Sequence, residues 1–262
     1  LTQLNNLFQP LSIREKEFKN RIFSTGHMAV MLDDGKPSQR LAAYHGAKAK
    51  GGAALTIVEA ARVHPTGDSG RPAIRAYDPA CVLGYKKLAD ACQSHGCLVF
   101  GQLTHPGREM VLASDGSRPV AYAPAAVPNE RFHVMPRAMP INLINEIIEG
   151  FELSASHLSQ AGLDGIELVA SHGYLLGQFL NPKINLRTDK FGGSFEGRLR
   201  FLRHAIQATR RGAGTEMIVG VRLSGEDKDY TENDLGQMLE ICSALDSESD
   251  LDYFNITVGT SA

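Results

Sequence analysis

Short apolar runs alternate with longer segments of helical spacing along the whole chain. Apolar runs of this length are typical of buried strands, and a 3.6-residue repeat of apolar positions is typical of helices. Six runs predict strands: Arg21–Ser24, Leu55–Glu59, Leu98–Gly101, Gly165–Val169, Met217–Val221 and Tyr253–Thr257. Five segments between them predict helices: Ser38–Lys50, Asp78–His95, Ile141–Ala161, Ser194–Arg211 and Thr231–Leu245. Strand and helix in regular alternation predict a parallel sheet with right-handed crossovers.

Two of the helical segments show an apolar stripe that predicts the face they bury. In the second segment the stripe is Leu83, Leu88 and Ala91. In the third segment it is Ile147, Phe151, Leu153 and Leu158. Glycines follow several helices, at the place where a helix commonly stops.

The pattern fits either an open doubly wound sheet or most of a (β/α)8 barrel, and two observations favour the barrel. No GxGxxG fingerprint follows an early strand, as a dinucleotide-binding open sheet would require. Polar or small residues also recur at the ends of nearly all the strands: Thr25, Gly26, Glu59, Ala60, Gln102, His172, Arg222 and Thr257. A barrel builds its active site from all these strand ends. We therefore expect an α/β fold, a TIM barrel.

The number of strands is small for a complete barrel. Eight strand–helix units take about 250 residues without insertions, and this chain spends long loops at 104–140 and 172–193. We expect one domain over residues 1–262, without the last one or two units of the barrel. Residues Arg14–Lys19 are rich in charge, which predicts the solvated face of an N-terminal hairpin.

Composition narrows the class of protein. The chain has 262 residues, 43% hydrophobic and 21% charged, with a net charge of -2. This balance offers no argument for binding nucleic acid or a membrane surface, and no apolar run approaches the length of a membrane span. The spacing of Cys81, Cys92, Cys97 and Cys242 fits neither a metal site nor a disulfide framework. Free thiols and a cytoplasmic location are the expectation.

Four polar residues are the first candidates for chemistry. His172 and Tyr174 follow a buried strand, where an imidazole can bind a substrate oxygen and a phenol can deliver a proton. Gln102 has an amide that can pair with the edge of a heterocyclic ring, although the residue taken alone favours a loop cap. Arg222 ends a buried strand and needs an anionic ligand or a carboxylate, for which Glu59 and Glu167 are the alternatives.

The remaining polar residues are predicted to have structural roles. Arg187, Thr188 and Asp189 are expected to order their own loop, and Glu59 to hold a neighbouring strand. The histidines His27, His105 and His133 have no metal-binding spacing, so no metal site is predicted.

Five segments in order resemble the old yellow enzyme family of FMN-dependent oxidoreductases. They are LFQPLSIREKEFKNRIFSTGH, KAKGGAALTIVEAARVHPTG, GQLTHPGRE, the stretch from Glu167 to Arg200, and VGVRLS at 219–224. The fourth is long and specific, and together the segments cover essentially the whole chain. The resemblance implies a (β/α)8 barrel preceded by a small hairpin.

The resemblance also implies roles for the matching positions. Thr25, Gly26, Met28 and Ala60 would lie along a flavin, Gln102 would bond its pyrimidine edge, and Arg222 would stabilise negative charge on the reduced ring. His172 would polarise a substrate carbonyl and Tyr174 would protonate the α-carbon. In this scheme hydride passes from NAD(P)H through FMN to an activated alkene in a small-molecule substrate.

Two positions depart from the family pattern. Val169 stands in the first place of a His/Asn pair, so the clamp on a carbonyl has one donor where the family has two. Met28 stands where some relatives have a cysteine, and a thioether cannot form a thiolate bond, so FMN should be noncovalent.

The opening segment and the HisProGlyArg loop resemble the multidomain branch with dienoyl-CoA reductases and N-methylamine dehydrogenases or demethylases. Members of that branch continue into an iron–sulfur cysteine cluster and a second nucleotide-binding region. An iron–sulfur cluster is thus expected only in a longer form of the chain. The FMN phosphate loop would likewise lie beyond Ala262.

Three functions remain open from the sequence: an ene-reductase, a flavin-dependent N-methylamine dehydrogenase, and a non-catalytic remnant barrel that acts through protein contacts. The sequence is also compatible with a homo-oligomer.

Overall fold

The central element of the protein is one parallel sheet of six strands, in the order β12-β11-β10-β7-β6-β3. The computed structural model describes residues 2–113, 115–226, 235–247 and 250–258. The strands are β3 (Phe23–Ser24), β6 (Leu55–Arg62), β7 (Leu98–Thr104), β10 (Gly165–Ala170), β11 (Ile218–Glu226) and β12 (Tyr253–Val258). All neighbouring pairs are parallel. Each predicted run overlaps one of these strands, and five of the strands extend beyond the run, so the predicted parallel sheet is confirmed.

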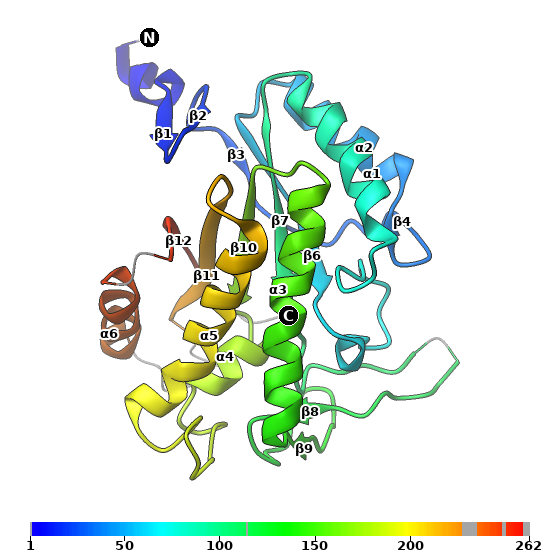
Figure 1. Ribbon diagram of the computed structural model, residues 1–262, viewed down its shortest axis with the longest axis vertical. Helices are drawn as coiled ribbons and strands as arrows, with labels where there is room; N and C mark the ends of the chain where they lie inside the picture. The colour runs from blue at the N-terminus through cyan, green and yellow to red at the C-terminus, as the bar shows by residue number, and fades with distance from the viewer. Residues whose placement is uncertain (1, 114, 227–234, 248–249, 259–262) are drawn as a thin grey trace.

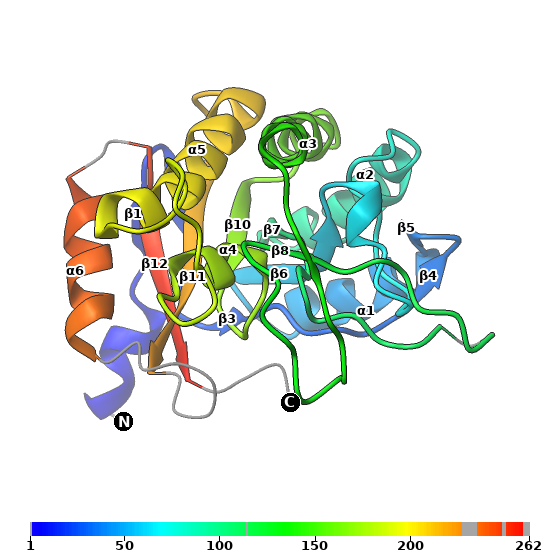
Figure 2. The same ribbon diagram turned by 90° about the horizontal axis from the view of Figure 1, so that it is seen from below.

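The helices follow the predicted alternation and cover the outer face of the sheet. They are α1 (Gln39–Lys50), α2 (Cys81–Gln93), α3 (Ile141–Gln160), α5 (Phe195–Ala213) and α6 (Leu235–Asp246), while a further short helix, α4 (Leu175–Leu180), lies between β10 and α5. Serine side chains cap two of them, because Ser38 accepts from the Leu41 amide at 3.2 Å and Ser194 from the Gly197 amide at 3.1 Å. Figure 2 shows α5, α3 and α2 in a row along one side of the curved sheet.

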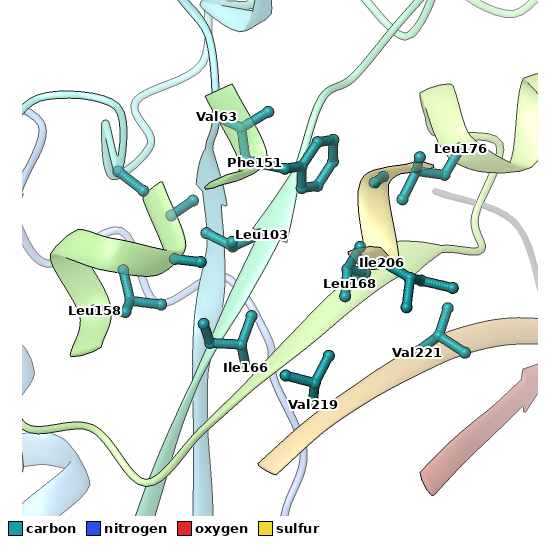
Figure 3. Packing of buried hydrophobic residues seen from close by; sticks show 14 of the residues in the cluster. Val63, Leu103, Phe151, Leu158, Ile166, Leu168, Leu176, Ile206, Val219 and Val221 are labelled. Atoms are coloured by element: carbon teal, nitrogen blue, oxygen red, sulfur yellow. The ribbon is translucent and has the colours of Figure 1, made fainter. Parts of the chain in front are cut away.

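The core between helices and sheet is formed by alternate strand residues. Figure 3 shows Phe151 of α3 beside Val63 and Leu103, and Ile206 of α5 beside Leu168 and Val221. Helices α3 and α5 lie side by side over this core (Figure 1). Apolar residues pointing outward from strands toward covering helices are the usual arrangement of a barrel wall.

Two residues of the predicted helical stripes were placed on the wrong face. Leu83 is 63% exposed and Leu153 is 49% exposed, whereas Leu88 and Phe151 are fully buried. Leu153 follows Phe151 by two positions, which is about 200° around a helix, so the two side chains cannot share one face.

The inner face of the sheet has an apolar lower part and a polar middle. Phe100, Ile57 and Ile218 form the lower part with Phe18. One step higher, Gln102 and Glu167 lie on neighbouring strands in register. This curled parallel sheet with helices outside is the architecture of a TIM barrel, represented here by six of its strands.

The N-terminal hairpin closes the lower end of this interior. It consists of β1 (Leu11–Ile13) and β2 (Lys16–Phe18), which pair antiparallel. The hairpin itself was predicted, but its charged residues are not a purely solvated face. Arg14 lies 2.5 Å from Asp252, Lys16 lies 3.1 Å from Asp164, and Phe18 is 1% exposed.

Short elements complete the connections. They are the 3-10 helices η1 (Thr2–Phe8) and η2 (Pro65–Gly67), and the strand pairs β4 (Leu32–Asp33) with β5 (Lys36–Pro37) and β8 (Tyr122–Ala123) with β9 (Arg137–Ala138). None of the helices in the described residues could cross a membrane.

The long loop predicted at 172–193 contains helix α4, which the sequence reading missed. The rest of the loop is ordered as predicted. Arg187 binds both carboxylate oxygens of Asp189 at 3.1 and 2.5 Å and donates to the carbonyls of Pro124 and Met139. The Asp189 carboxylate in turn accepts from the Phe191 amide, and its contact with the Arg187 guanidinium lowers the pKa of that carboxyl.

Candidate active site

A cavity of about 370 Å³ lies at the carboxyl ends of the strands. Its lining residues are Gly26, His27, Met28, Ala60, Arg71, Gln102, Val169, His172, Tyr174 and Arg222. The structure therefore brings together all but one of the residues predicted for the site, from five separate segments of the chain. Carboxyl ends of parallel barrel strands are where such enzymes place their active sites.

Thr25 is the predicted residue that does not line this cavity. It lines a second cavity of about 340 Å³ inside the lower barrel, together with Phe23, Ile57 and Phe100. Successive residues of an extended chain point to opposite sides, so Thr25 and Gly26 face different spaces.

His172 and Tyr174 project from a tight turn between β10 and α4. His172 and Gly173 have left-handed backbone angles, with φ of 58° and 73°. A histidine in this region is uncommon, and strain of this kind is a recurring feature of functional sites. The turn ends at Tyr174, which forms the N-cap of α4.

The imidazole of His172 is held by its neighbours. Its Nδ1 lies 2.6 Å from the Ser171 hydroxyl, and its backbone amide donates to Ser224 Oγ at 3.4 Å. Burial and the positive charge of Arg222 lower the pKa of His172 below its usual 6.5. A neutral imidazole with Nδ1 engaged leaves Nε2 for a ligand in the cavity.

Gln102 is oriented by the buried carboxylate of Glu167. The sequence had suggested Glu167 only as an alternative partner of Arg222. Gln102 Nε2 donates to Glu167 Oε1 at 2.6 Å, and Glu167 Oε2 accepts from Tyr253 and Asn255 at 2.9 Å each. With its amide nitrogen bound to Glu167, Gln102 presents its carbonyl oxygen as the free acceptor. Gln102 is therefore not a loop cap.

Arg222 contacts neither Glu59 nor Glu167 in the described part of the chain, so the alternative of a salt bridge to either is wrong. Its guanidinium donates to the Gly26 carbonyl at 3.3 Å and to Thr257 Oγ1 at 3.2 Å. Among the described residues its buried Nε has no hydrogen-bond partner. A buried, unpaired guanidinium N–H is costly and suits an acceptor on a ligand.

Glu59 binds backbone amides of the irregular segment after Met28, and not the neighbouring strand that was predicted. Its Oε2 accepts from the amides of Ala29 and Val30 at 2.9 and 3.1 Å, which fixes the segment after Met28. Burial is the main influence on this carboxyl and raises its pKa above the usual 4.5.

His27 and Arg71 line the cavity but were not selected from the sequence. His27 Nε2 lies 2.6 Å from the Tyr44 hydroxyl, so it belongs to the wall formed with α1. Arg71 comes from the loop after β6, which has neither periodicity nor a strand end to mark it. No group of three or more His, Cys, Asp or Glu side chains that could hold a metal occurs in the described ranges.

The comparison with known families decides the relationship. The sequence profile of the NADH:flavin oxidoreductase / NADH oxidase family matches residues 6–253. This chain belongs to that family. The resemblance to old yellow enzymes and the barrel fold are thereby confirmed.

Named relatives of this oxidoreductase family member are similar along nearly its whole length. An NADH oxidase of Thermoanaerobacter brockii is 36% identical over 99% of this chain and 40% of the relative. A multifunctional alkene reductase/demethylase of Caballeronia cordobensis is 34% identical over 97% of this chain and 37% of the relative. The chain thus spans about two fifths of the length of these curated relatives.

Solved structures give the same picture. A 2-naphthoyl-CoA reductase in complex with 2-naphthoyl-CoA superimposes with a TM-score of 0.90 at 29% identity, covering 98% of this chain and 41% of that chain. A morphinone reductase in complex with tetrahydroNAD superimposes with a TM-score of 0.85 at 27% identity, covering 96% of this chain and 73% of that chain.

The cavity residues of this family member fit a flavin ring. Gln102 offers an acceptor and Arg222 a buried donor without a partner, while Met28, Ala60 and Val169 supply apolar surface. Gly26 leaves room for the Gln102 side chain to take this position, because a Cβ atom at residue 26 would lie 2.5 Å from it. Apolar surface combined with convergent polar groups is the usual form of a cofactor site.

Proposed function

We propose that this chain is the catalytic barrel of an FMN-dependent oxidoreductase that takes hydride from NAD(P)H and reduces an α,β-unsaturated carbonyl or thioester. The observation that supports this most is the single cavity shared by Gln102 and Arg222 with His172 and Tyr174. Noncovalently bound FMN would supply the hydride chemistry. Family membership supports flavin and NAD(P)H as the redox partners.

His172 is proposed to bind the substrate carbonyl oxygen through Nε2–H. Its pKa is lowered by burial and by Arg222, so the ring is neutral at pH 7 and acts as a hydrogen-bond donor. Val169 lines the cavity in the place of a second donor, so polarisation of the carbonyl depends on His172 alone.

Tyr174 is proposed to protonate the α-carbon of the alkene. The turn that holds His172 also holds Tyr174, and their ring centroids lie 6.4 Å apart. A carbonyl bound at one ring therefore places the adjacent carbons near the other.

Arg222 and Gln102 are proposed to hold the cofactor ring. The half-buried Arg222 cation would stabilise negative charge that develops there, because a fixed charge in a partly desolvated site acts more strongly than in water. Gln102, oriented by Glu167, would accept a hydrogen bond from a ring N–H.

The first experiment is the visible spectrum of the purified protein, followed by identification of any pigment released on denaturation. FMN in stoichiometric amount, released without proteolysis, supports the proposal and noncovalent binding. A colourless protein that also fails to take up added FMN contradicts it and favours a remnant barrel.

Substitution of Tyr174 by Phe tests the proton donor. Alkene turnover should fall by about 10²–10⁴-fold, the usual contribution of a positioned acid, while flavin reduction by NAD(P)H should persist. Stopped-flow measurement of both half-reactions separates the two steps. Tyr122→Phe, in β8 and outside the cavity lining, is the matched control. Unchanged alkene turnover would remove Tyr174 from the mechanism.

A second candidate is the oxidation of an N-methylated amine, and Val169 is the observation that favours it. An amine needs no two-donor clamp on a carbonyl. Relatives of this chain include an N,N-dimethylglycine/sarcosine dehydrogenase of Chromohalobacter salexigens, 30% identical over 95% of this chain and 36% of the relative. The two functions differ in direction: an amine should reduce the oxidised flavin, whereas an alkene should reoxidise the reduced flavin.

A further inference from the structure

Arg71 separates two neighbouring cavities at the mouth of the site. It lines the cavity that contains His172 and Tyr174, and it also lines a second cavity of about 440 Å³. The second cavity is formed by Gly35, Asp68, Ser69, Gly70, Arg71, Pro72, Ala73, Arg75 and Pro119. A molecule bound at His172 can therefore extend past the Arg71 guanidinium into additional space.

The loop that carries Arg71 is held in a defined position. Buried Arg62 donates to Ser69 Oγ at 3.0 Å, and the Ser69 carbonyl accepts from the Val111 amide at 3.2 Å. Gly70 has a φ of +77°, and a Cβ atom there would lie 2.6 Å from the Val111 carbonyl oxygen. The Arg71 side chain is exposed, but these contacts fix the two residues that precede it, Ser69 and Gly70.

The Arg71 guanidinium is also positioned by an aromatic ring. It lies 5.7 Å from the ring centroid of Phe132, which Arg131 approaches at 4.9 Å. A cation–π contact of this kind orders an arginine without neutralising its charge.

No carboxylate neutralises Arg71 among the described residues. Asp68, three positions earlier, accepts from Arg75 at 3.3 Å and from the Tyr77 hydroxyl at 2.9 Å. Arg75 is further approached by Asp34 at 3.5 Å. The nearby acids thus serve Arg75, whereas Arg71 keeps a free guanidinium fork of the shape that binds a carboxylate or phosphate with two hydrogen bonds.

The other charges of the first cavity reinforce this preference. Arg222 is the second cation in its lining, and no Asp or Glu side chain of the described residues lines it. Glu59 and Glu167 lie outside the lining and are occupied by hydrogen bonds to Ala29, Val30, Gln102, Tyr253 and Asn255. The mouth of the site is therefore suited to an anion.

We propose that Arg71 is a specificity-determining residue that selects substrates with a carboxylate or phosphate group beyond the reacting carbons. The anionic group binds the guanidinium, and the remainder of the molecule occupies the cavity between Gly35 and Pro119. This inference rests on the proposed function in one respect: the reacting carbons of the substrate lie at His172 and Tyr174.

The test compares a benzylideneacetone that bears a ring carboxylate with its neutral methyl ester. In the FMN-loaded protein, Arg71→Gln should raise KM for the carboxylate about 5–10-fold, the value of one typical hydrogen-bonded contact at an exposed side chain, and change KM for the ester less than 2-fold. The kcat values should stay within about 2-fold, because the contact is made equally before and during reaction. Arg71→Lys should retain part of the preference, because it keeps the charge and loses the fork.

Arg131→Gln is the matched control, since it removes the other guanidinium beside Phe132 from outside the cavity lining. It should leave both KM values unchanged. Equal effects of Arg71→Gln on acid and ester, or no effect on either, would overturn the proposal.

Binding of the saturated carboxylate analogue, measured by calorimetry, distinguishes this inference from the proposed function. A 5–10-fold weaker Kd in Arg71→Gln supports the anion contact even in a protein without alkene turnover. An unchanged Kd rejects the contact even in a protein that reduces the alkene.

Discussion

At the scale of single residues, the site combines side chains that are aimed at the cavity with others that fix them from behind. Glu167 is the clearest example of the second kind, because it is fully buried and accepts hydrogen bonds from Gln102, Tyr253 and Asn255. Glu167 lies on β10, and its three donors lie on two other strands, β7 and β12. The orientation of the Gln102 amide thus depends on the closure of the sheet, and not on its own loop.

Glu59 provides a prediction at this scale, because its pKa is raised above 4.5 by burial. Folding favours the protonated form of such a group. Its contribution to stability is fully present below pH 4.5 and is lost as pH rises through the raised pKa of the folded state. Glu59→Gln cannot ionise, yet its amide oxygen can still accept from Ala29 and Val30. The variant should therefore gain stability relative to the natural protein as pH rises above 4.5.

Urea unfolding of both proteins at several pH values between about 4 and 8 measures this difference directly. Glu149→Gln, on the solvent side of α3, is the control for removing one negative charge. A stability difference between Glu59→Gln and the natural protein that is flat with pH, or that falls, would refute the argument.

The sequence predicted the cavity residues that stand at strand ends, and it missed those that depend on tertiary contacts. His172, Tyr174 and Arg222 each follow or end a recognisable apolar run. Arg71 lies in an irregular loop, and only its proximity to Phe132 and to the cavity distinguishes it. Thr25 and Gly26 were both predicted to lie along the flavin, but only Gly26 lines this cavity; the strand before them has only two residues, too few to show which of the two faces it.

At the scale of elements, the alternation of strands and helices was predicted with the right order and sheet type. Apolar runs and helical repeats are local signals, so they survive in the sequence. Helix α4 was missed because it is six residues long and its neighbours are polar. The stripe residues Leu83 and Leu153 were misplaced because hydrophobicity alone does not tell which side of a helix the sheet covers.

Helix α4 matters because it positions the turn that carries His172 and Tyr174. The Gln178 side chain of α4 makes the contacts that hold this turn. This fully buried side chain donates to the carbonyls of Gly173 and Pro106 at 2.6 and 3.1 Å and accepts from the Arg108 amide at 3.3 Å. It therefore joins the turn of His172 and Tyr174 to the loop after β7.

Gln178→Ala should destabilise the protein and displace the turn. Each buried group left without a partner costs about 1–3 kcal/mol, so a total loss of about 3 kcal/mol would lower Tm by about 6–12 °C. Alkene turnover should fall together with Tm, while flavin reduction by NAD(P)H should be retained, since Gln178 does not line the cavity. Stopped-flow kinetics at a temperature well below both Tm values tests this.

Gln160→Ala is the control, because Gln160 is exposed on α3 and, within the described part of the chain, its side chain bonds only Ser156. Gly107→Ala should reproduce the Gln178→Ala effect, because a Cβ atom at Gly107 would overlap the Gln178 amide. If both half-reactions fell equally in Gln178→Ala, Gln178 would be a general packing residue and not a positioning residue.

At the scale of the whole molecule, the hairpin ties the start of the chain to the far strands of the sheet. Arg14 reaches Asp252 before β12, and Asp252 also accepts from the Val219 amide of β11 and from Arg210 of α5. Lys16 reaches Asp164 before β10, and that carboxylate accepts from the Val99 amide of β7. These two acids thus connect the first residues to four strands, which local sequence patterns could not reveal.

The buried anchor of this arrangement is Phe18, and its removal is the test of the hairpin as part of the core. Phe18 is 1% exposed, and its ring lies 5.3 Å from that of Phe23 and 6.1 Å from that of Phe100. Phe18→Ala should cost about 3–5 kcal/mol, because it removes buried surface and leaves a cavity. Phe8→Ala, at a ring that is 60% exposed, should cost less than about 0.5 kcal/mol. Both values come from urea unfolding monitored by circular dichroism.

If the two variants were equally stable, the hairpin would be an appendage, and the lower end of the barrel would have to be closed by other contacts. If Phe18→Ala is destabilised as expected while its FMN content stays normal, then the lower closure and the cavity at the opposite end of the strands are energetically separate parts of one barrel.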